Sequence, residues 1–197
     1  LSESLFTVFL NQRTANSNDY AISTRRMVQL NDSVLLVSSY KGNYEVNINT
    51  GKPKLVAPAY VCFGFAEAGA GNYLCAEENR GIYTYTGRNA AFKKTGAEDS
   101  RYRCLVKDSS GNFWAAGVGC LHVMNRNAEV KRMRLAVAGI DSAGLIIKSI
   151  VFANGTQAWL GSNQGLLQLN ISIGELQPYS YPQGTAPTVL PDINAMA

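Results

Sequence analysis

The feature that most constrains this chain is a sequence pattern that recurs about every forty residues. Two copies are plain, one at residues 108–124 and one at residues 154–169. Each consists of a polar turn, a short apolar run centred on Trp114 or Trp159, a glycine-containing turn and a further run that begins with leucine. Two weaker copies without tryptophan precede them. The second turns of the four copies fall, at spacings of 39, 39 and 45 residues, at Gly42, Gly81, Cys120 and Gly165.

The segments around each copy complete a unit of four short strands. One apolar run precedes every copy, and a polar turn followed by another short strand comes after it. Glycine and asparagine at the turns supply the positive backbone angles that tight hairpins require. Units of four strands at this period are typical of propeller blades. We therefore predict an all-β fold, a β-propeller fragment of about four four-stranded blades.

The same period predicts how the chain, as a single propeller segment, is divided. The expected blades are residues 22–60, 61–100, 101–145 and 146–187, with the end of a preceding blade at 1–21 and the start of a following one at 188–197. We favour a piece of a larger ring over a small ring closed by the two ends. The remaining blades of the parent protein are then expected partners, with a homodimer through exposed blade faces as the alternative.

A blade has two apolar faces and must stack on its neighbours to bury them. Trp114 and Trp159 are therefore predicted to lie between blades, and this interpretation is favoured over stacking on a ligand. The positions that define the repeat structurally are Gly42, Gly81, Gly111, Trp114, Gly155, Trp159, Gly161 and Gly165.

Composition excludes several classes of function. The net charge is +4, but the basic residues are scattered and no aromatic-and-basic stripe accompanies them, so nucleic-acid binding is not expected. No apolar run reaches membrane-spanning length, and the first residues do not resemble a signal peptide. The cysteines are expected to be buried thiols, with a disulfide in an oxidising compartment as the alternative; they are Cys62, Cys75, Cys104 and Cys120.

Residues for catalysis are sparse. His122 is the single histidine, so neither a metal site nor a Ser-His-Asp arrangement is expected, and no cofactor is predicted. The carboxylates of Glu77, Glu78 and Asp99 leave glycoside hydrolysis open, because sequence alone does not give their separation. A carbohydrate-active propeller enzyme, sialidase-like or lyase-like, therefore stays as an alternative.

The two clear copies resemble the regulator-propeller repeat, whose pattern is roughly Asp-x-x-Gly-Asn-hydrophobic-Trp-x-Gly-Thr-x-x-Gly-Leu. The matching residues are Asp108, Gly111, Asn112, Trp114 and Leu121 in one copy and Gly155, Trp159, Gly161, Gly165 and Leu166 in the other. The chain departs from the pattern at Ala116, Cys120 and Ser162. The resemblance covers about residues 22–190.

In that family, such repeats form the periplasmic sensor of hybrid two-component systems of Bacteroides-type bacteria, and the sensed ligands are often oligosaccharides. The resemblance implies a non-catalytic, periplasmic ligand-sensing segment, without the histidine kinase or DNA-binding parts of the parent protein. A propeller that serves as a protein-interaction scaffold is the first alternative, and the carbohydrate-active enzyme is the second.

Ligand contacts are expected in the loops between second and third strands and in the connections between blades, because binding residues concentrate in loops held by a rigid scaffold. Aromatic, arginine and amide side chains in these loops suit sugar rings and hydroxyl groups. The candidate ligand-binding residues are Tyr40, Lys41, Glu78, Asn79, Arg80, Arg101, Tyr102, Asn163 and Gln164.

Overall fold

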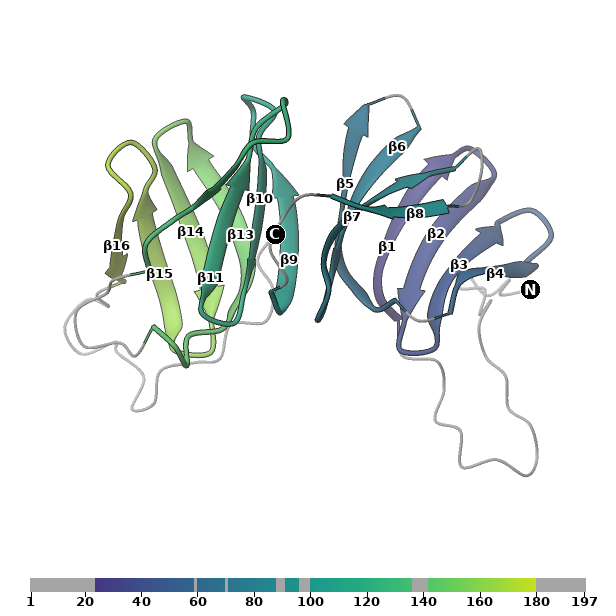
Figure 1. Ribbon diagram of the computed structural model, residues 1–197, viewed down its shortest axis with the longest axis horizontal. Coiled ribbons are helices and arrows are strands. Elements are labelled where there is room, and N and C mark those ends of the chain that lie inside the picture. Colours follow the sequence, from purple (N-terminus) through teal and green to yellow (C-terminus); the bar gives the residue numbers. More distant parts are fainter. Residues whose placement is uncertain are drawn as a thin grey trace, which may run out of the picture.

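A computed structural model describes residues 24–58, 60–69, 71–87, 91–95, 100–135 and 142–179. Within these ranges there is no helix, and sixteen strands form four antiparallel sheets of four strands each. The sheets follow one another in chain order across the molecule (Figure 1). The predicted all-β fold of four four-stranded blades is confirmed. The segments 1–21 and 188–197, predicted to belong to neighbouring blades, lie outside the described residues.

Each sheet is a meander whose strands pair in sequence order, and we number the sheets blades 1 to 4. Blade 1 contains β1 (Thr24–Asn31), β2 (Val34–Ser39), β3 (Gly42–Asn47) and β4 (Pro53–Ala57). Blade 2 contains β5 (Cys62–Gly69), β6 (Asn72–Glu77), β7 (Gly81–Thr86) and β8 (Ala91–Lys94). Blade 3 contains β9 (Tyr102–Lys107), β10 (Phe113–Gly117), β11 (Cys120–Met124) and β12 (Val130–Arg132). Blade 4 contains β13 (Ile147–Asn154), β14 (Gln157–Ser162), β15 (Gly165–Asn170) and β16 (Glu175–Pro178).

Backbone conformation explains why glycine recurs at the turn between the second and third strands. Gly42 has a φ of +121°, and Gly81 and Gly165 also have positive φ, a backbone region that favours glycine. In blade 3 the positive φ falls one residue earlier, at Gly119. Cys120 can therefore stand where the other three blades have glycine.

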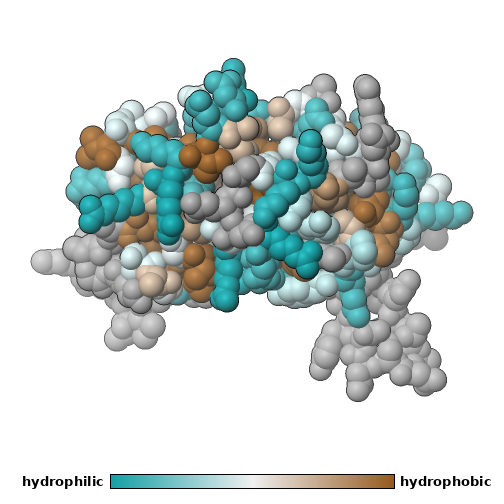
Figure 2. Space-filling view, in the orientation of Figure 1, coloured by the Kyte–Doolittle hydropathy of each residue, from teal (hydrophilic) through white to brown (hydrophobic). Residues whose placement is uncertain are grey.

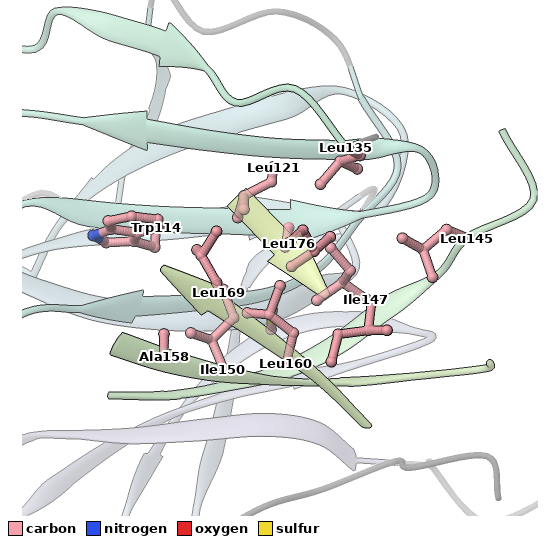
Figure 3. Packing of buried hydrophobic residues seen from close by; sticks show 13 residues of the cluster. Trp114, Leu121, Leu135, Leu145, Ile147, Ile150, Ala158, Leu160, Leu169 and Leu176 are labelled. Atoms are coloured by element: carbon pink, nitrogen blue, oxygen red, sulfur yellow. The ribbon is translucent and has the colours of Figure 1, made fainter. Parts of the chain in front are cut away.

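Three apolar clusters lie between consecutive blades. The cluster between blades 1 and 2 is rich in tyrosine, and those between blades 2 and 3 and between blades 3 and 4 are largely aliphatic. Figure 3 shows the last of these, in which Trp114 of blade 3 lies at one end, toward Leu169 and Ala158 of blade 4. Burying each such side chain contributes about 1.5–3 kcal/mol, so stacking of blades is the main source of stability.

The two tryptophans differ in their surroundings. Trp114 is 3% exposed and packs edge-to-face on Phe152 of blade 4, with ring centroids 5.6 Å apart, which confirms its predicted place between blades. Trp159 is half-buried and lies on the face of β14 opposite to Ala158 and Leu160, which belong to the core with blade 3. The described residues hold no further blade on that side, so a position between blades stays a prediction for Trp159.

The four cysteines are buried thiols, as expected from their apolar strands. Burial raises the pKa of the Cys104 thiol to about 12. Burial, together with contact with Cys62, raises the pKa of the Cys75 thiol well above its usual value.

Candidate ligand-binding edge

One edge of each blade collects the loops in which ligand contacts were predicted. In blade 1, Thr24 at the start of β1 pairs with Ser39 at the end of β2, and Ser39 pairs with Gly42 at the start of β3. The other blades repeat this antiparallel register. The start of each first strand, the turn between second and third strands and the end of each fourth strand therefore share one edge. We call it the connection edge, since the chain also passes there from blade to blade.

Hydrogen bonds fix the turns of the connection edge to the incoming chain. The backbone N–H of Glu78 donates to the carbonyl of Val61 at 3.0 Å, and that of Val118 donates to the carbonyl of Arg101 at 3.0 Å. In blade 4 the Asn163 side chain accepts a bond from the Ile146 N–H at 2.7 Å. The loops are thus held by the scaffold, which reduces the entropy lost when a ligand binds.

A β-bulge recurs near the start of every first strand. Thr24 pairs with Ser39 and Arg26 with Ser38, so Arg25 between them has no opposite residue. The register shifts in the other blades leave Phe63, Arg103 and Lys148 at the same place. A bulged residue leaves the strict alternation of side chains, and bulges re-aim side chains at functional sites.

The bulged side chains of blades 1 to 3 contact one another across the blades. The Arg25 guanidinium lies 3.8 Å from the ring centre of Tyr40 and 5.9 Å from that of Phe63. The Arg103 guanidinium lies 4.5 Å from the ring centre of Phe63 and forms an ion pair with Glu78. We call these five residues the cation–aromatic row. Their strands are neighbours, because β1 contacts β5 and β5 contacts β9.

The candidate residues are distributed along this edge. Tyr40 (54% exposed) and Glu78 belong to the cation–aromatic row, and Arg80 lies over the ring of Tyr60 at 5.5 Å. The side chain of Asn163 bonds the backbone of the chain that enters blade 4. The remaining candidates on turns or connections that reach the surface are Lys41, Asn79, Arg101 and Gln164.

Tyr102 must be removed from the predicted ligand-binding residues. The sequence placed it in a connection between blades, but it is the first residue of β9 and is fully buried. Its hydroxyl group lies 2.8 Å from Nδ1 of His122, which is also buried. Both side chains are part of the protein interior and do not reach a ligand on the surface.

The carboxylates considered for catalysis bind groups of the chain itself. Glu77 is buried and accepts hydrogen bonds from the backbone N–H groups of Asn79 at 2.8 Å and Val61 at 3.4 Å. Glu78 is paired with Arg103, and Asp99 lies outside the described residues. In the part of the chain that the structure describes, no three His, Cys, Asp or Glu side chains gather as a metal site would require.

Two shallow clefts lie between blades at the opposite edge. One, of ≈ 420 Å³, separates blades 2 and 3 and is lined by residues that include Leu74, Phe113 and Arg126. The other, of ≈ 480 Å³, separates blades 3 and 4 and includes Trp114. One of the two cations of the first cleft, Lys107, already donates to the Glu67 carbonyl at 3.0 Å. The connection edge, which joins aromatic rings to cations from three blades, is the better candidate.

The bulged residues were missed from the sequence although the repeat contains a signal for them. Arg25, Phe63, Arg103 and Lys148 occupy equivalent places, each second in its strand. Three of the four are cationic. A comparison of the four units position by position, without assuming strict alternation, would have shown this column.

The fold and this edge define the class as a segment of β-propeller with a polar and aromatic connection edge. No protein-family model matches the sequence, and no curated protein matches it either. Within the described ranges there is no helix of a length and hydrophobicity that would cross a membrane.

Solved structures with the same fold include extracellular domains of two-component systems. The chain is similar to the extracellular domain of BT4673, described as a hybrid two-component system of B. thetaiotaomicron, with a TM-score of 0.67 and 14% identity over 84% of this chain and 23% of that one. It is similar to the corresponding domain of BT3049 of the same organism, with a TM-score of 0.61 and 17% identity over 81% of this chain and 22% of that one. The chain thus spans less than a quarter of these domains.

An enzyme has a similar fold as well. Virginiamycin B lyase from Staphylococcus aureus matches with a TM-score of 0.62 and 13% identity, over 87% of this chain and 59% of the enzyme. At such identities the similarity concerns the fold. This similarity agrees with the predicted propeller fold and does not by itself indicate a function.

Proposed function

We propose that the chain is a non-catalytic, extracytoplasmic (periplasmic) ligand-sensing segment of a hybrid two-component sensor, and that it responds to an oligosaccharide. The observation that carries the proposal is the connection edge, where the bulged residues Arg25, Phe63 and Arg103 of three successive blades form one contact row. Rings and hydrogen-bonding groups held on a rigid scaffold are the usual composition of a ligand site. The extracellular sensor domains of similar fold support the same class.

The carboxylates considered for catalysis bind groups of the chain itself, which supports a binding role over catalysis. A glycosidase needs two carboxyl groups about 5–10 Å apart that are available to the sugar. Glu77 is buried against backbone N–H groups and Glu78 is paired with Arg103.

Binding of oligosaccharides to the 197-residue chain tests this function. We expect calorimetry against a panel of plant and host oligosaccharides to show at least one saturable ligand that is recovered unchanged. Saturable binding should weaken in Tyr40→Ala and persist in Ile173→Ala, which removes an exposed apolar side chain from the turn between β15 and β16 at the opposite edge. Release of a shortened product would instead support the enzyme alternative, and failure of every saccharide to bind would contradict the proposal.

A second candidate function, binding of further protein blades, is favoured by the outer faces of blades 1 and 4. Met27 and Leu55 are 59% and 48% exposed on blade 1, and Tyr179 is 37% exposed beside the half-buried Trp159 on blade 4. On the face in view in Figure 2, hydrophobic side chains lie among hydrophilic ones. The proposed partners are the remaining blades of the parent protein, or a second copy of this chain. Light scattering of the chain across concentrations distinguishes a dimer from a monomer.

A further inference from the structure

Among the described residues, no carboxylate is paired with the bulged arginine of blade 1. The Arg25 guanidinium is placed over Tyr40, and its Nε atom is buried without a hydrogen bond. Among the described residues, no carboxylate oxygen lies within 4.0 Å of it. A buried donor on a charged group is costly unless something binds it, so an anion at this position would be stabilised.

The surrounding part of the connection edge is cationic. The bulge position adds Arg103, while the turns and connections add the exposed side chains of Arg80 and Arg101. The described carboxylates of this region, Glu77 and Glu78, already bind backbone N–H groups and Arg103 respectively. Clustered charge of one sign raises the local concentration of oppositely charged ligands.

The chemistry of the cation–aromatic row narrows the class of ligand that could bind there. A guanidinium is planar and pairs in bidentate fashion with carboxylate and with similarly shaped oxyanions such as sulfate. Tyr40 is 54% exposed, so part of its ring remains available beside Arg25 for packing against an apolar surface such as the face of a sugar ring.

We propose that the cation–aromatic row binds an anionic oligosaccharide, with Arg25 paired to a carboxylate or sulfate group and Tyr40 packed against a neighbouring sugar ring. This inference rests on the proposed function, since it names the ligand class of the same edge.

Calorimetry with matched ligands tests the charge requirement. The probes are trigalacturonic acid, its uncharged methyl ester, a sulfated galactose disaccharide and the desulfated form of that disaccharide. We expect at least one acid to bind the 197-residue chain about tenfold or more tightly than its uncharged counterpart, with affinity that falls as NaCl is raised. The two anionic arms identify which group, carboxylate or sulfate, is recognised.

Variants locate the anion. Arg25→Gln should lower the affinity for the preferred acid about tenfold or more, and should change the affinity for its uncharged counterpart by less than about twofold. Arg25→Lys keeps the positive charge but not the planar guanidinium that pairs in bidentate fashion. Its affinity for the acid should lie between those of the parent chain and Arg25→Gln. Arg126→Gln removes the same charge at the opposite edge, in the turn after β11, and should bind like the parent chain. Circular dichroism verifies the β fold of each variant. If Arg25→Gln does not fold, Tyr40→Ala, which changes an exposed residue of the same row, gives an independent reading.

The outcomes separate the two proposals. Equal binding of acid and uncharged form overturns the anionic ligand but leaves an oligosaccharide sensor standing. Equal losses in Arg25→Gln and Arg126→Gln show an effect of net charge and overturn the placement at the row. Absence of binding by all four probes and by the wider panel removes the proposed function together with this inference.

Discussion

At the scale of single residues, the Asp108 carboxylate holds a turn and a core tryptophan together. It accepts hydrogen bonds from the backbone N–H of Asn112 at 2.8 Å, from the Asn112 side chain at 2.9 Å and from the Trp114 indole at 2.9 Å. The aspartate, asparagine and tryptophan of the repeat pattern are therefore one hydrogen-bonded group. In blade 4 this group is absent, because Asn154 bonds only within its own turn, to Thr156.

The same group predicts how stability depends on pH. Burial raises the pKa of Asp108, but the hydrogen bonds from Trp114 and Asn112 outweigh it, so the pKa lies below its usual value. A depressed pKa contributes stability above the unfolded-state value, and this contribution is lost as the pH falls through the folded-state value. We expect Asp108→Asn to lower the free energy of unfolding by about 2 kcal/mol at pH 7 and by less at pH 2.5.

Urea denaturation at both pH values measures this difference. The exposed Asp32, in the turn after β1, provides the control variant Asp32→Asn, which should change stability by less than about 0.5 kcal/mol. A loss in Asp108→Asn that is the same at both pH values would show that the negative charge is not what stabilises the turn.

At the scale of strands, close packing between neighbouring backbones explains glycines that the repeat pattern does not. A Cβ atom at Gly117 would lie 1.8 Å from the carbonyl oxygen of Arg101, whereas one at Gly155 would have no atom within 4 Å. Gly155 also lacks the positive φ that strains other residues. The glycine that matches the family pattern is thus replaceable on steric grounds, while Gly117 at the connection edge is not.

A pair of alanine variants tests this difference. Gly117→Ala should destabilise the chain by at least about 2 kcal/mol, because the backbone of blade 3 must move to admit a methyl group. Gly155→Ala should be neutral within about 0.5 kcal/mol. Thermal unfolding followed by circular dichroism measures both, and equal stability of the two variants would contradict the close approach at Gly117.

The tryptophans give a second pair of variants at this scale. Trp114→Ala should lower the free energy of unfolding by about 3–5 kcal/mol, because it empties a site between two sheets. Trp159→Ala should cost less than half as much, because Trp159 is only half-buried and, among the described residues, its one aromatic contact is with Tyr179. Urea denaturation of the two variants provides the comparison, and equal losses would show that Trp159 is as fully packed as Trp114.

The strands could largely be predicted from the sequence, whereas the side chains at their starts could not. The repeat around Gly42, Gly81 and Gly165 reflects local turn geometry, which each short segment encodes by itself. A bulge at Arg25 depends instead on how two residues of one strand oppose one of the next. Tyr102 was misplaced because it stands at the boundary between a connection and a strand, and the sequence does not show that the side chain of this first strand residue is buried.

At the scale of the whole molecule, each blade packs only on its sequence neighbours. The apolar clusters join blades 1 and 2, 2 and 3, and 3 and 4, and no cluster of the described residues joins blade 1 to blade 4. In such arrays stability is approximately a sum of unit and interface contributions. The inner blades are therefore covered on both faces, while the described chain leaves one face of each outer blade open.

Hydrogen exchange should reveal this difference in stability between the inner and the outer blades. We expect the amides of β6 and β10, central strands of blades 2 and 3, to exchange most slowly, and those of β4 and β16, at the outer edge of blades 1 and 4, to exchange first. Mass spectrometry of peptic fragments measures both groups at once. Uniform protection across the four blades would indicate one cooperative unit and contradict the additive picture.

The bulges also bear on how such a protein diversifies. Since the residue at each bulge stands outside the ladder pairing, a mutation there changes what the edge displays without disturbing the hydrogen bonds that build the sheet. The four bulge positions, one per blade, can then change independently under selection. Duplicated copies of the gene could in this way acquire new specificities one substitution at a time while the framework stays intact.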